Sequence, residues 1–341
     1  MNNIVAMYHA LRNVVAFDDL VNILSQEYGM PRRKSYQDGL SLIDRCELLA
    51  KDWVRFQYAR NLRTRASVPD AELNGNIVCT ALQFYAIIKA GEVKPLYLIT
   101  ADASDFIRST AFTQKLEPQY FIDNFKAPLV LYSGEPKTLF DDILCVEMFY
   151  NEEQRTLECL LSCGAEGSQS RVFSRQIPVE DLDGLFTQDI LAMEELGPSI
   201  QYILQQGFVN AVDDLENRFF EAIRYALKFK LLMESDKQPL VSERLHRKGG
   251  NAQKRDQLFG KLNQQRISLT TVYRQAIRQN GGSEKLVLDK EGKTLKAIKV
   301  RGYLRRQHYG PGNSLIKTVF IDAHDSQAWK NSGIRIIQVV K

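Results

Sequence analysis

The residues best suited to chemistry form a basic, glycine-punctuated segment between positions 301 and 313. Its cationic, polar and ring side chains are Arg301, Tyr303, Arg305, Arg306, Gln307, His308 and Tyr309. Guanidinium groups bind phosphates with bidentate geometry, and tyrosine or histidine rings stack on unpaired bases. Gly310 and Gly312 let the backbone turn and approach a partner closely. The segment suits single-stranded or ribosomal RNA and equally an acidic protein, while an ordinary hairpin with solvated arginines is the structural alternative.

Positive charge extends through the whole C-terminal part of the chain. Residues 237–341 contain 22 Lys and Arg against 7 Asp and Glu, a net charge of +15, while the remainder has 23 against 34, a net of −11. The density is highest at Lys285, Lys290, Lys293, Lys296, Lys299, Arg301, Arg305 and Arg306. Such a division predicts that the C-terminal part binds polyanions and that the rest avoids them.

Motifs for the common enzymes are absent from the sequence. There is no P-loop, nucleophile elbow, dinucleotide-binding fingerprint or zinc-peptidase helix. Asp322, His324 and Asp325 are the nearest approach to a metal or acid–base group, but turn chemistry at the end of a strand is the favoured interpretation. Cys159 and Cys163 would share a strand face without a second ligand pair. The sequence therefore predicts neither a metal site nor a cofactor, and no catalytic residue is assigned.

Helical spacing dominates the first third of the chain and short apolar runs the middle. Helices are expected over residues 4–28, 40–66, 77–90, 190–206 and 211–233, with glycine stops at Gly29 and Gly91. Strands are expected over 95–100, 128–132, 143–150, 155–163 and 171–177, the last three forming an antiparallel meander. Beyond these, a helix is expected over 258–279 and strands over 295–304, 315–322 and 334–340.

These patterns predict an α+β protein. It comprises an N-terminal helical region (1–94), a central antiparallel or mixed sheet with long helices (95–236), a basic linker (237–257) and a small basic C-terminal α+β domain (258–341). The five cysteines are odd in number and lack Cys-x-x-Cys spacing, and neither a secretion signal nor a membrane-spanning run is visible. A cytoplasmic protein without membrane contact is expected.

The C-terminal pattern resembles a type V-A anti-CRISPR family whose members are carried by plasmids and phages. That family has an Arg-Gly pair followed, eight residues after the glycine, by Gly-x-Gly, which Arg301-Gly302 and Gly310-Pro311-Gly312 match. A later Asn-Ser-Gly is matched by Asn331, Ser332 and Gly333. The family has tryptophan at the position of Leu304, and the similarity is specific only over about 301–333.

The resemblance implies an unusual function. The family's best-known member recognises its effector nuclease during translation and causes loss of the messenger RNA. This chain would then recognise a specific polypeptide, either as a nascent chain or as a finished protein. Its basic C-terminal part would contact RNA or the ribosome. The residues implied in binding are Arg301, Gly302, Tyr303, Arg305, Arg306, Gln307, His308, Tyr309, Gly310, Gly312, Asn331, Ser332 and Gly333.

Two other functions stay open at this point. A helix followed by basic strands is similar to the layout of small ribosome-dependent messenger RNA endonucleases, which work without metal. His308, Tyr309 and Arg305 would then be the catalytic candidates. The second alternative is a DNA- or RNA-binding regulator without enzymatic activity, using the basic helices expected over 40–66 and 258–279.

Overall fold

The computed structural model describes most of the chain, in several stretches. They are residues 3–31, 36, 39–61, 70–112, 116–133, 139–164, 171–186, 210–245, 262–271, 273, 285–288, 294–295, 299–300, 303–322, 324–325 and 335–338. The helix expected over 190–206 lies outside them.

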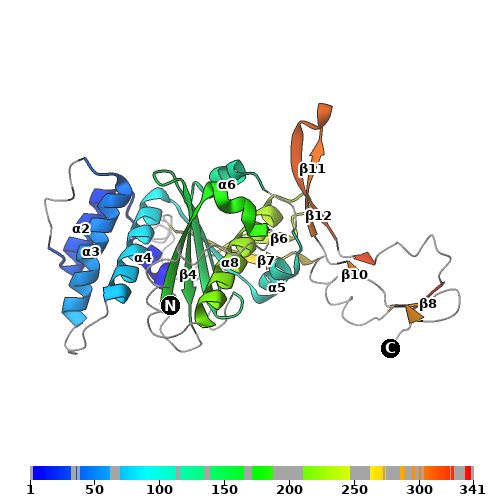
Figure 1. Ribbon diagram of the computed structural model, residues 1–341, viewed down its shortest axis with the longest axis horizontal. Helices are drawn as coiled ribbons and strands as arrows, with labels where there is room; N and C mark the ends of the chain where they lie inside the picture. The colour runs from blue at the N-terminus through cyan, green and yellow to red at the C-terminus, as the bar shows by residue number, and fades with distance from the viewer. Residues whose placement is uncertain are drawn as a thin grey trace, which may run out of the picture. The chain divides into compact units, whose positions relative to one another are not determined.

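The described residues form an α+β protein, as the sequence predicts (Figure 1). Its α-helices are α1 (Asn3–Ala10), α2 (Phe17–Tyr28), α3 (Leu42–Asn61), α4 (Asp70–Lys89), α5 (Ala101–Ser109), α6 (Pro118–Phe125) and α8 (Asn210–Glu234). The 3-10 helices are η2 (Val179–Phe186) and η4 (Pro311–Asn313). The strands of the main sheet are β1 (Lys94–Ile99), β2 (Leu129–Ser133), β3 (Ile143–Asn151), β4 (Thr156–Cys163), β5 (Arg171–Pro178), β6 (Leu240–Arg244) and β7 (Leu262–Leu269).

The main sheet is mixed and has the strand order β5-β4-β3-β2-β1-β7-β6. Strands β3 to β5 form the expected antiparallel meander, which β2 extends on the β3 side, while β1 and β2 run parallel. Parallel neighbours need a long crossover, and here α5 and α6 lie between them in the sequence. The remaining strands form smaller sheets: β10 (Lys299–Val300) with β13 (His324–Asp325), β11 (Tyr303–Tyr309) with β12 (Leu315–Ile321), and β14 (Arg335–Gln338) with β8 (Lys285–Leu288) and β9 (Thr294–Leu295).

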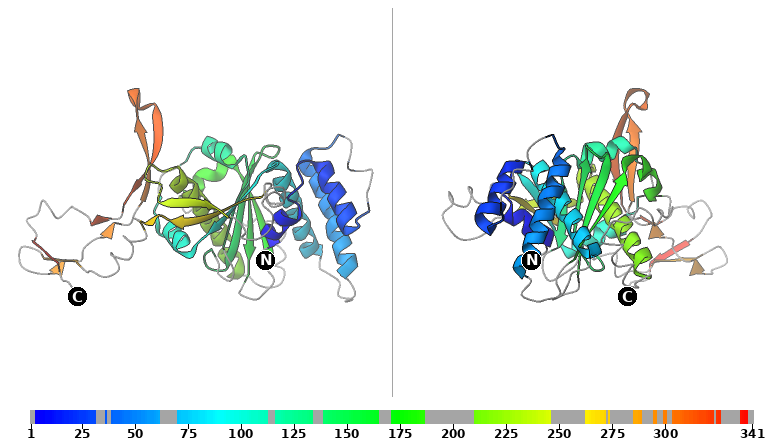
Figure 2. Two further views of the ribbon diagram at one scale, coloured as in Figure 1. Left: turned by 180° about the vertical axis from the view of Figure 1, so that it is seen from behind. Right: turned by 60° about the vertical axis from the view of Figure 1, so that its left-hand side comes forward.

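Helices cover both faces of the β2–β5 meander. Figure 2 shows α1 to α4 on one side of these strands and the first part of α8 on the other. Alternation along β3 explains this burial on both sides, since Phe149 packs into the core with the N-terminal helices while Met148 points to the opposite face. The strands consequently carry almost continuous runs of buried side chains.

The sequence patterns located most helices and strands of this first part correctly. The stops predicted at Gly29 and Gly91 are confirmed, because both glycines adopt the left-handed backbone conformation, with φ of 77° and 68°. The single helix expected over 4–28 is in fact two helices, α1 and α2, which the Asp19 carboxylate separates by accepting hydrogen bonds from the N–H groups of Val15 and Ala16.

The helix expected over 258–279 is wrong at its centre. Residues 262–269 form strand β7, which is hydrogen-bonded into the main sheet beside β1. Strand β6 likewise lies within residues 237–257, which the sequence predicted to be a basic linker. Pairing with neighbouring strands and burial of Leu262, Ile267 and Leu269 outweigh the helix propensity of the intervening glutamines and arginine.

A buried lysine fixes the start of β1. Lys94 is fully buried, and its Nζ donates hydrogen bonds to the carbonyl oxygens of Val14 (2.7 Å), Ile87 (2.9 Å) and Gly91 (2.7 Å). The Ile87 carbonyl belongs to the last turn of α4 and Gly91 lies just after that helix, a position where backbone acceptors lack helical partners and the helix dipole favours a cation. The ammonium group thus ties α4, β1 and the loop after α1 together.

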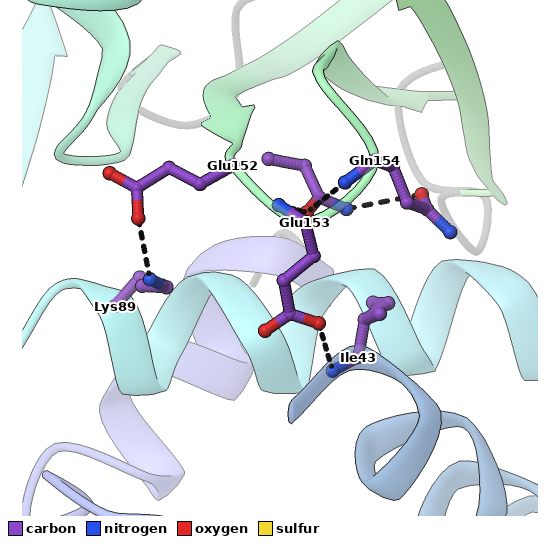
Figure 3. Close-up of polar contacts among 6 residues, drawn as sticks. Ile43, Lys89, Glu152, Glu153 and Gln154 are labelled. Atoms are coloured by element: carbon purple, nitrogen blue, oxygen red, sulfur yellow. Dashed lines mark hydrogen bonds and ion pairs between the residues drawn. The ribbon is translucent and has the colours of Figure 1, made fainter. Parts of the chain in front are cut away.

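The turn between β3 and β4 contacts the N-terminal helices in a second way. Figure 3 shows Glu153 accepting a hydrogen bond from the Ile43 N–H at the start of α3 (3.1 Å), while Glu152 forms an ion pair with Lys89 (3.3 Å). The Oγ of Ser41 accepts a bond from the Asp44 N–H in the same helical turn. A carboxylate is favoured at a helix N-terminus because the free N–H groups and the dipole both stabilise it.

Replacing Glu153 with alanine is therefore expected to lower the free energy of unfolding by about 0.5–1 kcal/mol. Glu152→Ala is the matched control, since it removes the same charge from the same turn and breaks only a solvent-exposed ion pair, whose loss should be within about 0.5 kcal/mol. Urea unfolding midpoints of the two variants test this. Equal losses would show that Glu153 contributes no more than an ordinary surface charge.

Two compact units are distinguished by their internal contacts. The first comprises Met1–Ile99, Lys115–Ala226 and Glu243–Arg266, and the second comprises Thr100–Gln114, Leu227–Ser242 and Ile267–Lys341. The domain boundaries expected from composition stay a prediction. The hairpin containing most of the basic segment lies in the second unit.

Candidate nucleic-acid interface

The basic segment forms a two-stranded antiparallel hairpin. Strand β11 pairs with β12 from Tyr303 opposite Ile321 to Tyr309 opposite Leu315, without a bulge. The pairing makes seven rungs, and the ribbon is a sheet of its own. The hairpin that the sequence offered as a structural alternative is thus the fold of this segment, and its function depends on which side chains each face presents.

Alternation along the strands sorts the side chains into two faces. One face carries Tyr303, Arg305, Gln307 and Tyr309 with their partners Ile321, Val319, Lys317 and Leu315. The other carries Leu304, Arg306 and His308 with Phe320, Thr318 and Ile316. Tyr303 and Arg305 share a face as the sequence predicts, and each face has at least one cation.

The turn at the end of the hairpin requires its glycines. Gly310 and Gly312 have φ of 80° and 63°, in the region that side-chain-bearing residues rarely adopt. A Cβ on Gly310 would also lie 3.1 Å from the Cδ1 of Leu315. Ser314 closes the turn by donating from its Oγ to the Pro311 carbonyl oxygen (3.0 Å). These glycines therefore have a structural reason to be present, whatever else they contact.

Apolar contacts hold the base of the hairpin. Leu304 and Phe320 form a buried rung, each with about 2% of its surface exposed. The Phe320 ring lies 5.4 Å from that of Phe106 and 5.7 Å from that of Tyr273. The Leu304 N–H donates to the carbonyl oxygen of Ala111 (2.9 Å). The hairpin thus begins from a packed aromatic cluster.

Two aspartates complete this anchorage. Asp236 receives the Phe320 N–H on its Oδ1 (3.2 Å) and donates its own N–H to the Thr318 carbonyl oxygen (3.3 Å). Asp322 accepts hydrogen bonds from Tyr273 Oη (2.9 Å) and from Lys237 Nζ. Burial and the neighbouring Asp322 carboxylate raise the pKa of Tyr273, which therefore stays a neutral donor. Asp322, which the sequence offered as a metal candidate, instead accepts these two hydrogen bonds at the base of the hairpin.

Exposure rises from the base of the hairpin to its turn. Arg305, Gln307, His308 and Tyr309 are exposed on β11, and Leu315, Ile316 and Lys317 on β12. Lys317 Nζ lies 5.6 Å from the centre of the Tyr309 ring, a cation–π contact across the strands. The ribbon therefore presents arginine, lysine and aromatic groups together to solvent, which is the combination that nucleic-acid surfaces use.

The three catalytic candidates of the endonuclease hypothesis are divided between the faces. Arg305 and Tyr309 lie on one face and His308 on the other. Acid–base catalysis and charge stabilisation at one phosphate need groups that converge on it. Along the described hairpin, therefore, these three side chains do not form a common site. No group of three or more His, Cys, Asp or Glu residues suitable for a metal occurs in the part of the chain that the structure describes.

Several residues of the expected binding set lie outside the described residues. These are Arg301, Gly302, Asn331, Ser332 and Gly333. Conversely, Lys317, Leu315 and Ile316 complete the two faces from β12 and were not among the residues predicted to bind. The available signal was the Gly-Pro-Gly turn between segments 303–309 and 315–321, because a turn that joins two strands determines which of their residues pair.

Perturbed carboxyl groups occur elsewhere, in the first unit. Burial raises the pKa of Glu147 to about 8, although a hydrogen bond from Tyr8 opposes this rise. Burial also raises the pKa of Glu158 to about 7, against hydrogen bonds from Thr156, Asn151 and Gln176. Shifts of this kind are frequent at active sites. Both side chains, however, are completely buried within the protein and belong to its core.

Fold and site together define an α+β protein with N-terminal helices that carries a basic, aromatic β-hairpin. No protein-family model matches the chain, and no curated protein does. The crystal structure of AcrVA2 is a weak structural neighbour, with a TM-score of 0.39 and 9% sequence identity, covering 89% of this chain and 97% of that one. No helix in the described residues is long and apolar enough to cross a membrane.

Proposed function

We propose that this chain is an anti-defence factor, of the kind represented by anti-CRISPR proteins, whose β11–β12 hairpin binds RNA. The observation that carries the RNA contact is the placement of Arg305, Arg306 and Lys317 on both faces of a ribbon anchored at its base. Phosphates attract such cations without regard to sequence, and release of counterions makes the binding dependent on salt.

The anti-defence role rests on the sequence pattern between Arg301 and Gly333. By that resemblance, the chain recognises a specific polypeptide, as a nascent chain or a finished protein, and lowers its expression through loss of the messenger RNA. The opposite charges of residues 1–236 and 237–341 support a division of labour in which the acidic part contacts protein and the basic part contacts RNA or the ribosome. We propose a binding role rather than catalysis, since the hairpin separates the catalytic candidates.

Removal of a hairpin cation tests the RNA contact. For the full chain and a fluorescent single-stranded RNA, Lys317→Gln or Arg305→Gln is expected to weaken binding and to reduce the slope of log K against log salt by about 0.7. Anisotropy titrations at several salt concentrations between 50 and 200 mM measure both quantities, since that span separates charge effects well. An unchanged slope in both variants would contradict a phosphate contact at the hairpin.

A matched control separates this local effect from net charge. Arg155→Gln removes one positive charge from an exposed position in the first unit, where Arg155 pairs with Glu180 at 2.9 Å. Its salt slope should equal that of the unaltered chain. If Arg155→Gln and Lys317→Gln behave alike, the RNA responds to overall charge and the hairpin has no special part.

The polypeptide target needs a separate experiment. The full chain is used as bait in a lysate that is actively translating, and the captured material is analysed for ribosomes, RNA and nascent chains. Enrichment of one coding sequence, together with a fall in its messenger RNA, is expected. Absence of all three kinds of material would overturn the proposed function.

A further inference from the structure

We propose that the outer end of the β11–β12 hairpin is a wedge that enters between two unpaired bases of an RNA loop or single strand, one base stacking on each face. This inference rests on the proposed RNA contact and names its substrate class as looped or single-stranded RNA. It concerns the last two rungs before the turn, His308 opposite Ile316 and Tyr309 opposite Leu315, which we call the tip rungs.

The tip rungs repeat one arrangement on both faces. Each consists of a planar ring paired with an aliphatic side chain, Tyr309 with Leu315 on one face and His308 with Ile316 on the other. A flat ring supported by a neighbouring aliphatic group is the surface on which a nucleobase stacks. Because the two faces point in opposite directions, a ribbon between two bases can stack on both at once.

Exposure of these side chains is unusual for a solvated turn. Tyr309, Leu315 and Ile316 retain 43%, 49% and 43% of their surface exposure, whereas Leu304 and Phe320 at the base of the same hairpin are buried. A ribbon that only held phosphates would gain nothing from aliphatic groups at its end, since they cannot bind a charged oxygen. Apolar side chains inserted between bases are a known means of unstacking nucleic acids.

Cations lie two rungs below each ring, on the same face as the ring. Arg306 precedes His308 by two positions on one face, and Lys317, opposite Gln307, lies two rungs before Tyr309 on the other. Successive same-face residues on a strand are about 7 Å apart. A nucleotide whose base stacks on the ring therefore brings its phosphate within reach of the cation. This combination of ring, aliphatic group and cation favours RNA as the occupant over an apolar protein surface.

The base of the hairpin supplies the stiffness that a wedge needs. Asp236 binds β12 at Thr318 and Phe320, and Ala111 binds β11 at Leu304. These bonds hold both strands near the base of the hairpin. The bonded position closest to the turn, Thr318, is two rungs below His308. Gly310 and Gly312 then let the chain reverse in a narrow turn, so that little backbone obstructs entry between bases.

The test uses the full chain and two RNA probes with equal numbers of phosphates. One is a stem–loop with 2-aminopurine in its unpaired loop, and the other is fully paired. The unaltered chain should bind the loop about tenfold more tightly and change the 2-aminopurine fluorescence. Tyr309→Ala should lose about tenfold in loop affinity and the fluorescence change, with no change in salt slope, while Tyr309→Phe should retain both.

The possible outcomes distinguish a failure of the wedge from a failure of the proposed RNA contact on which it rests. Binding to neither RNA would refute the proposed RNA contact itself. Equal binding to both probes, with Tyr309→Ala and His308→Ala both neutral, would overturn the wedge and leave the phosphate contact standing. Capture by phosphatidylserine vesicles that depends on Tyr309, without preference for the loop, would overturn it in favour of a membrane surface. Circular dichroism of each variant verifies that the hairpin variants are folded.

Discussion

Phe320→Ala is expected to lower the free energy of unfolding of the second unit by about 3–5 kcal/mol. The Phe320 side chain is 2% exposed and packs against the rings of Phe106 and Tyr273. Its removal leaves a cavity at the point where the hairpin joins that unit. Hydrogen exchange should show the loss directly, because the amides of Leu304 and Phe320 bond to Ala111 and Asp236 in the folded state.

Ile316→Ala provides the comparison within the same strand. Ile316 is 43% exposed and lies four residues from Phe320 on the same face of β12. Its truncation should change stability by no more than about 0.5 kcal/mol, as expected for a surface position. Similar protection of the Leu304 amide in both variants would show that the aromatic cluster does not anchor the hairpin.

The sequence offered this hairpin as one interpretation of the basic segment, because its turn signals are local, but it placed the first strand at 295–304, whereas β11 is Tyr303–Tyr309. Gly310 and Gly312 mark a turn, and the face shared by Tyr303 and Arg305 follows from the period of two of a strand. The meander of β3, β4 and β5 was equally visible, since each strand is a short apolar run bounded by polar loop residues. Elements specified by their own residues can be predicted from one sequence.

The anchorage of the hairpin could not be predicted in this way. Asp236 lies 84 positions before Phe320, and Ala111 lies 193 positions before Leu304. An aspartate that follows a helix and precedes a strand is ordinary turn chemistry, and nothing in its neighbours indicates a distant partner. The helix prediction for the residues of β7 was wrong for the same reason. The burial of this strand depends on pairing within the main sheet and only partly on its own residues.

Glu147 is the group whose protonation should affect stability most. It is completely buried in the sheet, where its Oε1 accepts a hydrogen bond from Tyr8 Oη of α1 (2.6 Å). Its Oε2 has no hydrogen-bond partner among the described residues. Desolvation penalises the charged carboxylate more than the Tyr8 hydroxyl stabilises it, so the pKa rises from 4.5 to about 8.

The direction of the pH dependence follows from this shift. The folded state holds the proton on Glu147 more tightly than the unfolded state does. Glu147 therefore lowers the free energy of unfolding least below about pH 4.5, where the group is protonated in both states. As the pH rises towards about 8, the unfolded chain releases the proton first and the folded state loses stability. Each unit of pH between these values corresponds to about 1.4 kcal/mol, and the complete effect is about 3–5 kcal/mol.

Glu147→Gln should therefore flatten the decline in stability between pH 5 and pH 8. The amide keeps an acceptor for Tyr8 and carries no charge, so the variant is expected to be more stable than the unaltered chain at pH 8 and nearly equal to it at pH 5. Thermal unfolding followed by circular dichroism across this range measures the difference. Glu158→Gln is the comparison, since the donors on Thr156, Asn151 and Gln176 stabilise that carboxylate, hold its pKa at about 7 and predict a smaller gain. Equal pH profiles for Glu147→Gln and the unaltered chain would mean that the Glu147 carboxylate is solvated in the folded protein, and the packing of α1 against β3 would then have to be looser than the Tyr8–Glu147 bond indicates.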